Sequence, residues 1–144
     1  MLYTQDRCRL RRIYCQAWRK FRDGKPLEPL ERMIAAVVQQ HPEYHALLEN
    51  QEAATGADFA VELGESNPFL HLSLHLTIRE QLGCNLPPGV TDIYQTLTGK
   101  VGDPHEAEHR MMECLASALW KVQRGDIQDA GDEYLSQIKI LIKQ

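Results

Sequence analysis

The stretch "NPFLHLSLHLTIREQ", residues 67–81, decides whether this chain folds into helices or sheets. Its centre alternates apolar and polar residues, which is the period of a half-buried strand. Asn67 and Pro68, however, form a helix start signal, a capping side chain followed by the residue best suited to the first helical position. Leucine supplies most of the apolar positions and favours helix over strand. Because the stretch before Gly83 is also long for a strand, we predict a helix over residues 68–82.

The rest of the chain shows helical periodicity and helix punctuation, and it contains no convincing strand. The residue before Pro42 resists the helical region, so one of the expected segments is either a kinked helix or two helices. Residues 51–66 are expected to be a connection with at most one short turn. The sequence therefore predicts an all-α protein, a compact bundle of about five or six helices in a single domain, residues 1–144. The other expected helices span residues 5–22, 29–49, 91–98, 104–124 and 132–143.

The composition is that of a soluble globular protein, with 43% hydrophobic and 25% charged residues. No apolar run approaches the roughly 20 residues that cross a bilayer, so we expect no membrane association. The basic start of the chain is not followed by the apolar core of a secretory signal, so a cytoplasmic location is expected. Four cysteines without a C-x-x-C pair are expected to be reduced thiols.

The charge is concentrated at one end of the chain. Residues 1–25 contain eight Lys or Arg and two Asp, a net charge of +6, whereas the whole chain carries −4. Such an arm can bind nucleic acid. Here, however, the basic residues alternate with apolar ones at helical spacing, as in an amphipathic helix that packs on an acidic body. We therefore do not expect nucleic acid, and this helix is a candidate contact for a protein partner or a second copy of the chain.

All six histidines fall in three H-x-x-x-H pairs, which is far more regular than chance placement would give. Residues four apart share one face of a helix, so each pair can present two imidazoles inward. Two pairs continue to a glutamate four residues further on, at Glu49 and Glu113. The pairs are His41/His45, His71/His75 and His105/His109.

Imidazole nitrogen and carboxylate oxygen together suit first-row transition ions, and facing helices can hold one or two such ions. We expect zinc or iron first, with manganese or nickel as alternatives. His41 is left out because it precedes a proline and is expected outside the helix. The competing interpretation is a hydrogen-bonded network of the same side chains without metal. The candidate ligands are His71, His75, His105, His109 and Glu113, followed by His45, Glu49 and Glu106.

Three functions are compatible with this pattern. The first is a metal-binding helical protein, in which an open coordination position would allow water activation or O₂ binding, with Glu108 or Glu113 as proton carrier. The second is a non-enzymatic adaptor or regulatory module whose histidine and glutamate cluster is structural. The third is a metal or redox sensor that uses the same ligands reversibly, with Cys84 or Cys114 exposed. The sequence leaves open whether the protein is an enzyme.

Five strings, "KPLEPLERMIA", "HPEYHALLE", "NPFLHLSLHLTIREQ", "LPPGV" and "GDPHEAEHRMMECLASALWKVQR", closely resemble the proteobacterial family named domain of unknown function 1841. The resemblance runs from about Gln5 to Arg124 and implies a bacterial protein. The family name implies no activity and no site residues. By histidine spacing alone, the chain is also similar to haemerythrin-like and DinB-like metal bundles, which is an analogy of pattern only.

Overall fold

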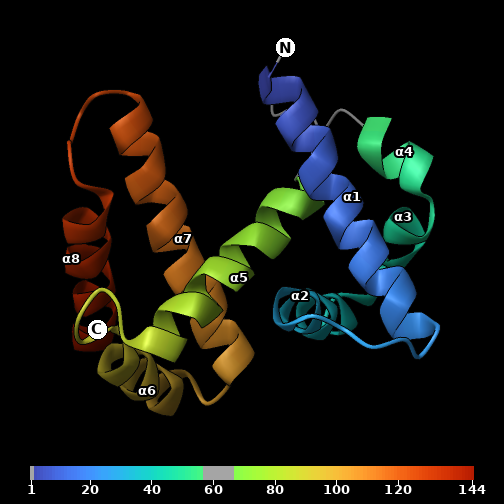
Figure 1. Ribbon diagram of the computed structural model, residues 1–144. Coiled ribbons are helices and arrows are strands. Elements are labelled where there is room, and N and C mark those ends of the chain that lie inside the picture. The colour runs from blue at the N-terminus through green and yellow to red at the C-terminus, as the bar shows by residue number, and fades with distance from the viewer. Residues whose placement is uncertain (1, 57–66) are drawn as a thin grey trace. The chain divides into compact units, whose positions relative to one another are not determined.

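The computed structural model describes residues 2–56 and 67–144, and this part of the chain is helical without a strand (Figure 1). The all-α prediction is therefore confirmed. Eight α-helices and one 3-10 turn are present in the described part, which is more than the five or six helices expected. The segment expected over residues 29–49 contains two helices, and a further short helix lies in the segment expected to be a connection, of which residues 57–66 are outside the described part. The helices are α1 (Leu2–Arg22), α2 (Pro29–Gln39), the 3-10 turn η1 (Pro42–Tyr44), α3 (His45–Glu49), α4 (Gln51–Gly56), α5 (Pro68–Cys84), α6 (Val90–Val101), α7 (Pro104–Gln123) and α8 (Ala130–Lys143).

The chain divides into two compact units, Met1–Ser73 and Leu74–Gln144, called unit 1 and unit 2 below. The boundary falls within α5, so each unit receives part of this helix. Each unit has its own buried apolar residues. The single domain expected over residues 1–144 stays a prediction.

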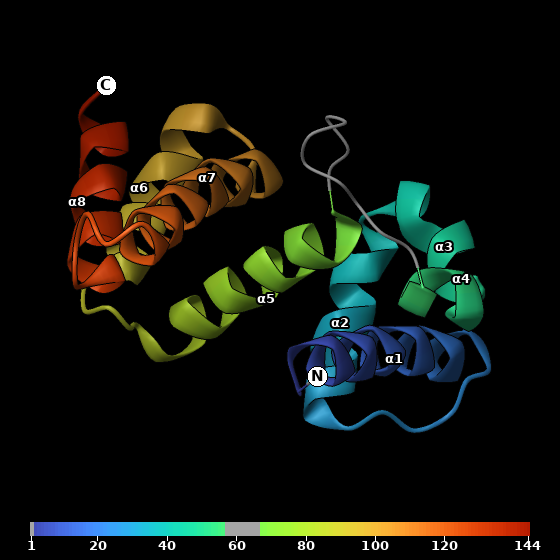
Figure 2. The ribbon, with the colours of Figure 1, turned by 90° about the horizontal axis from the view of Figure 1, so that it is seen from above.

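Unit 1 is built around α1, which packs against α2, α3 and α4. Figure 2 shows that α2 crosses α1 steeply. α4 lies beside the first half of α1, where Arg11 contacts Ala54, and α3 lies beside the C-terminal end of α1, where Arg22 contacts Glu49. The buried face of α1 has helical spacing, as its amphipathic pattern predicts. The apolar residues buried in this unit include Tyr14, Ala17 and Trp18 of α1, Ile34, Val37 and Val38 of α2, and Leu48, Ala54, Phe69 and Leu72.

The basic residues of α1 are partly used inside unit 1. Lys20 Nζ lies 2.8 Å from a carboxylate oxygen of Glu31, and Arg22 Nη1 lies 2.9 Å from one of Glu49. Arg11 is buried and donates from Nη1 to the Ala54 carbonyl over 3.0 Å. These contacts agree with an amphipathic helix that packs against acidic and polar segments.

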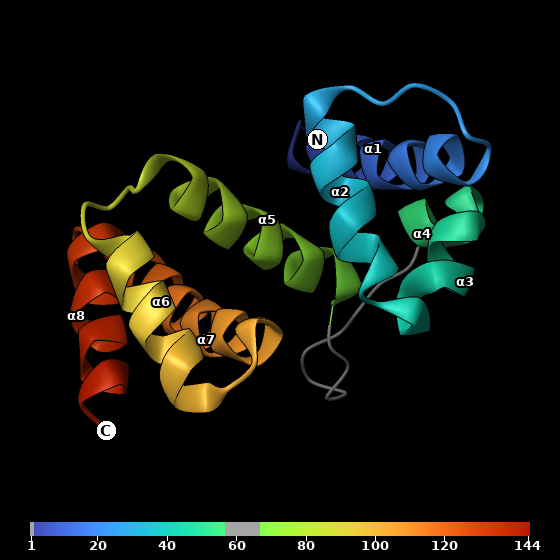
Figure 3. The same ribbon diagram turned by 90° about the horizontal axis from the view of Figure 1, so that it is seen from below.

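Unit 2 is formed by α6, α7, α8 and the second part of α5. The chain turns back between α7 and α8, and α6 packs against both of them (Figures 1 and 3). One contiguous core holds the unit together, and burying such side chains contributes about 1.5–3 kcal/mol each. Its members are Ile78, Val90, Ile93, Leu97, Ala107, Met111, Met112, Cys114, Leu115, Ala118, Tyr134 and Ile138.

Several ends of the helices follow the sequence signals, and others differ from them. Asn67 Oδ1 accepts hydrogen bonds from the backbone N–H groups of Phe69 and Leu70, so it caps α5 as predicted. The expected stop at Gly83 is wrong, because α5 continues to Cys84 and the left-handed residue that follows is Asn85, with φ of 53°. Asparagine is the non-glycine residue that best tolerates this conformation.

Candidate metal centre

The helical segment predicted over residues 29–49 breaks at His41, and the break decides what its histidines contact. α2 ends at Gln39, Pro42 starts the turn η1, and α3 begins at His45. The residue before a proline is pushed out of the helical region, and His41 accordingly has φ of −129° and ψ of 68°. His41 and His45 therefore do not share one helical face, unlike the pairs on α5 and α7.

His75 is the most enclosed histidine of unit 2, with no exposed surface. Its Nδ1 lies 2.7 Å from Oε1 of Glu108, which is itself only 5% exposed. Because an ionised carboxylate only accepts, Nδ1 carries the hydrogen and the neutral ring has its lone pair at Nε2. Arg79, one turn further along α5, donates from Nε to the same oxygen over 3.1 Å. Glu108 therefore fixes the tautomer and the orientation of His75.

The charge of Glu108 is set by opposing effects. Burial raises the pKa of this carboxyl, whereas the hydrogen bond from His75 and the positive charge of Arg79 lower it, and the net result is a pKa below the ordinary value. A buried carboxylate is costly unless it is paired and hydrogen-bonded, and Glu108 meets both conditions. It is therefore ionised at neutral pH.

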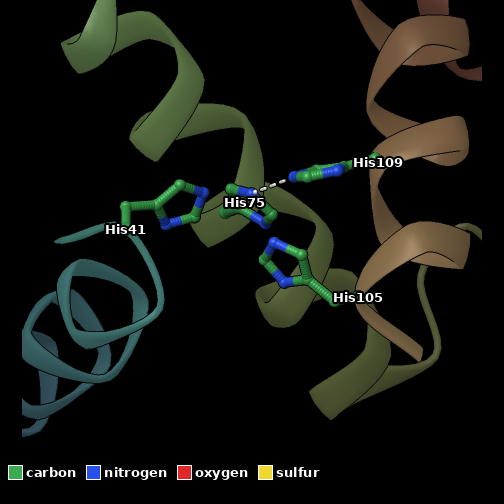
Figure 4. A group of neighbouring side chains, drawn as sticks. All are labelled: His41, His75, His105 and His109. Atoms are coloured by element: carbon green, nitrogen blue, oxygen red, sulfur yellow. Dashed lines mark hydrogen bonds between the residues drawn. The ribbon is translucent and has the colours of Figure 1, made fainter. Parts of the chain in front are cut away.

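His75 of α5 meets His105 and His109 of α7 in unit 2. Figure 4 shows these three side chains; His41, also drawn there, belongs to unit 1 and is described with it. One nitrogen from each of the three rings lies within 4.8 Å of the others. The Nε2 atoms of His75 and His109 are 3.1 Å apart, and the ring centroids of His105 and His109 are 4.3 Å apart. We call these three residues the histidine trio.

A second close contact between imidazoles lies in unit 1. Nε2 of His71, from the first turn of α5, is 3.1 Å from Nε2 of His41. His41 is 3% exposed, and its Nδ1 lies 2.8 Å from the Val37 carbonyl at the end of α2. His41 was not among the expected ligands, yet it is the histidine that His71 contacts inside this unit.

His45, an expected ligand, has different surroundings. Its Nε2 lies 2.8 Å from the Val38 carbonyl, so this nitrogen is used in a bond to the backbone. The ring also packs on Trp18, with centroids 4.4 Å apart. Within unit 1, His45 therefore contacts both the end of α2, through the Val38 carbonyl, and α1, through Trp18.

The three expected carboxylate ligands lie at the surface. Glu49 is in α3 and pairs with Arg22. Glu113 is exposed on α7, although it continues the His105/His109 spacing. Glu106 is exposed as well, and its carboxylate lies 3.5 Å from Arg110 and 3.9 Å from Nδ1 of His109. The carboxylate that contacts the trio from a buried position is Glu108, which the sequence suggested only as a proton carrier.

One signal in the sequence pointed toward a residue left out of the expected set. Arg79 continues the His71/His75 spacing, at the place that glutamate takes after the other two pairs, and in the structure it holds Glu108. Glu108 is flanked by Ala107, which has no exposed surface, so this side of α7 faces the core of unit 2. Nothing in the local sequence indicates that the ring of His41 turns back onto its own helix end.

The described part of the chain is an all-helical protein in which α5 and α7 bring three histidines together beside a buried carboxylate. The chain belongs to the family defined by a domain of unknown function, number 1841, whose model matches residues 6–140. The resemblance noted in the sequence is thereby confirmed. Comparison with curated proteins and with solved structures found no match.

None of the described helices combines the length and the apolar character required to span a bilayer.

Proposed function

We propose that the protein binds a transition-metal ion through the histidine trio of unit 2. The observation that carries this proposal is the 3.1 Å separation of the His75 and His109 Nε2 atoms, with the lone pair of His75 directed there by Glu108. Two nitrogens bound to one ion at about 2.0–2.1 Å are about 2.8–3.4 Å apart for bond angles between a right angle and the tetrahedral angle. The observed separation lies inside that interval.

The donor chemistry supports the same ions that the sequence suggested. Neutral imidazole is a borderline ligand that suits zinc and iron, and also manganese and nickel, whereas magnesium and calcium prefer oxygen. A carboxylate commonly accepts a hydrogen bond from the second ring nitrogen of a metal-bound histidine, which makes the ligand nitrogen more basic. Glu108 makes this contact with His75. Arg79 balances the charge of that carboxylate.

Because the protein supplies three ligands, the proposed ion keeps a coordination position for water or a small anion. Such a bound ion would supply Lewis acidity and a water of lowered pKa. This chain's own contribution is to hold the three rings together and to keep Glu108 ionised behind His75. Whether the outcome is catalysis, sensing or a structural role depends on what reaches that position.

Metal content of the purified protein tests the proposal. Full-length protein made without an affinity tag is stripped with a chelator, reloaded separately with zinc, iron, manganese or nickel, and assayed by elemental analysis. We expect a His105→Ala/His109→Ala variant to lose one equivalent that wild type retains. His45→Ala is the matched control, because it removes an imidazole that bonds to the backbone. Equal metal content in wild type and the double variant would refute the proposal.

A structural network is the second candidate, because the same 3.1 Å separation also fits an N–H···N hydrogen bond donated by His109 to His75. In that case the cluster would orient α5 and α7 in unit 2 without any ion. Chelator separates the two candidates. An ion that binds only the folded state adds stability, so its removal lowers the melting temperature, whereas a hydrogen-bonded network does not respond.

The basic helix α1 offers a weaker case for a partner. Several of its basic residues, including Arg9, Arg12 and Arg19, are exposed. They are available to an acidic protein surface or to a second copy of the chain. We rank such a contact below the metal site. We also propose that the protein is located in the cytoplasm.

A further inference from the structure

We infer that Glu106 is a positioning residue of the proposed metal site, where its carboxylate accepts a hydrogen bond from Nδ1 of His109 while Nε2 of that ring binds the ion. Glu106 then has the role for His109 that Glu108 has for His75. This role differs from the direct coordination that the sequence suggested for Glu106. The inference rests on the proposed function and names the residue that prepares the second of its nitrogen ligands.

The nitrogen that His109 offers to an ion is the first step. Its Nε2 lies 3.1 Å from Nε2 of His75. An ion shared by the two rings needs a lone pair on both of these atoms, and Glu108 provides one at His75 by fixing the hydrogen on Nδ1. A neutral imidazole carries one ring hydrogen, so His109 binds an ion through Nε2 only when its own hydrogen is on Nδ1. An acceptor beside Nδ1 favours that form of the ring.

The position of Glu106 is the second step. It lies three residues before His109 on α7, and residues with this spacing are neighbours on the surface of a helix. Oε2 of Glu106 lies 3.9 Å from Nδ1 of His109. The carboxylate is therefore beside the ring nitrogen that does not contact His75, which is where an acceptor for the ligand form of His109 has to be.

The freedom of this carboxylate to move is the third step. Its Oε1 lies 3.5 Å from Nε of Arg110, and both of its contacts are longer than the roughly 2.7–3.2 Å of an N–H···O hydrogen bond. The Glu106 side chain is 48% exposed, whereas Glu108 is buried. A movement of about 1 Å brings Oε2 within bonding distance of His109 Nδ1, and torsions of an exposed side chain allow it.

The location of the His109 hydrogen decides which contact the carboxylate makes. When His109 donates from Nε2 to His75, its Nδ1 presents a lone pair that does not attract a carboxylate, and the 3.9 Å distance fits this form. When an ion takes Nε2, the ring gives that hydrogen to water and takes one up at Nδ1, so the number of ring hydrogens is unchanged. The charge-assisted bond to Glu106 then closes to about 2.7–2.9 Å. Binding of the ion therefore draws the carboxylate from Arg110 toward His109.

The size of the effect follows from the exposure of Glu106. Loss of an outer carboxylate that supports a metal-bound histidine typically weakens metal binding about 10–100-fold. Water can partly replace an exposed acceptor, so we expect the lower limit, about 10-fold, for Glu106→Ala. Glutamine keeps an acceptor oxygen, and the affinity of Glu106→Gln should therefore lie between those of wild type and Glu106→Ala.

Zinc affinity of the chelator-stripped full chain, measured by competition with a coloured chelator, tests the inference. The readout is the equivalent of zinc that the His105→Ala/His109→Ala variant lacks. Glu106→Ala should still bind this equivalent, about 10-fold more weakly. Asp132→Ala is the matched control, because it removes an exposed acidic residue from the first turn of α8, and it should bind as wild type does. Equal affinity of wild type and Glu106→Ala, or complete loss of zinc from Glu106→Ala, would overturn the inference.

The ring resonances of His109 give a readout that a purely structural role of Glu106 would not move. In zinc-loaded protein, ¹⁵N spectra should show the metal on Nε2 and the hydrogen on Nδ1. Glu106→Ala should shift the Nδ1–H proton upfield and leave His75 unchanged, because the acceptor of His75 is Glu108. An unchanged Nδ1–H signal would overturn the inference and leave the proposed function intact, whereas wild type that binds no zinc would refute both.

Discussion

Removing the Glu108 carboxylate gives the sharpest test of how unit 2 holds its trio. Glu108 Oε1 accepts both from His75 Nδ1 and from Arg79 Nε, so Glu108→Ala removes the acceptor of one buried hydrogen bond from each of these side chains. Breaking a buried ion pair costs about 3–5 kcal/mol. The Arg79 side chain is 23% exposed and can be partly rehydrated, so we expect the lower end, about 3 kcal/mol.

Glu108→Gln separates the effect of the charge from the effect of the acceptor. The amide oxygen has two lone pairs and can receive both donors, so this variant loses only the difference between charged and neutral hydrogen bonds, about 1 kcal/mol each. A neutral side chain is also cheaper to bury, which offsets part of that loss. The expected destabilisation is about 1–2 kcal/mol.

Urea unfolding measures both values. Chelator is present throughout, so that no metal contributes. The two tryptophans fall in different units, and in a Trp18→Phe background the fluorescence of Trp120 reports on unit 2. In a thermal scan, about 3 kcal/mol corresponds to a melting temperature lower by about 12–24 °C in a unit the size of Leu74–Gln144.

Exposed Glu113 on the same helix provides the control, because surface substitutions are usually within about 0.5 kcal/mol. If Glu108→Ala destabilised unit 2 no more than Glu113→Ala does, the buried acceptor would not be holding His75 and Arg79. The order of the variants also matters: Gln must be milder than Ala, or the charge and acceptor argument is wrong.

Three further predictions concern other parts of the chain. Asp103 caps α7 through a hydrogen bond of 3.1 Å, and its replacement by alanine should cost about 1 kcal/mol in the same urea assay, whereas replacement by asparagine should cost little. Burial raises the pKa of the Cys15 thiol, so alkylation followed by mass spectrometry should label exposed Cys84 first and Cys15 only after unfolding; equal rates would contradict the packing. The hydrogen bond from Lys20 lowers the pKa of the Glu31 carboxyl in the folded state. The stability that this ionised carboxylate contributes is therefore present above its unfolded-state pKa and is lost as the pH falls through the lower folded-state pKa. The difference in unfolding free energy between wild type and Glu31→Gln should disappear in acid, and a difference that stays constant with pH would contradict this linkage.

Most of the helices could be predicted because their signals are local. Asn67 and Asp103 are capping side chains followed by proline, and both start helices in the structure. The break at Pro42 is local too, since it follows from the steric effect of a proline on the preceding residue. The division into two units was not predicted, because it depends on which helices pack together, and helical periodicity only indicates that a helix has a buried face.

The candidate site was less accessible to sequence reasoning, as Glu113 and Glu108 show. Positions four apart on an α-helix advance by about 40° around its axis, so Glu113 is turned about 40° from His109 and about 80° from His105. Glu108 lies on the other side of His109, and this is the side on which α5 approaches within unit 2. The spacing identified the helix that presents the rings, but the position of the neighbouring helix decides which carboxylate is buried.

The three H-x-x-x-H pairs have different structural outcomes, which shows what this spacing does and does not specify. His105 and His109 join one group, whereas His41 and His45 turn to different partners because Pro42 breaks the helix between them. What His41 and His75 share is a ring N–H fixed by an acceptor, which directs the remaining lone pair at a second imidazole. A fixed tautomer is therefore a better indicator of a nitrogen donor than the pair spacing. It becomes visible only when the carbonyl of Val37 or the carboxylate of Glu108 has been placed by the fold.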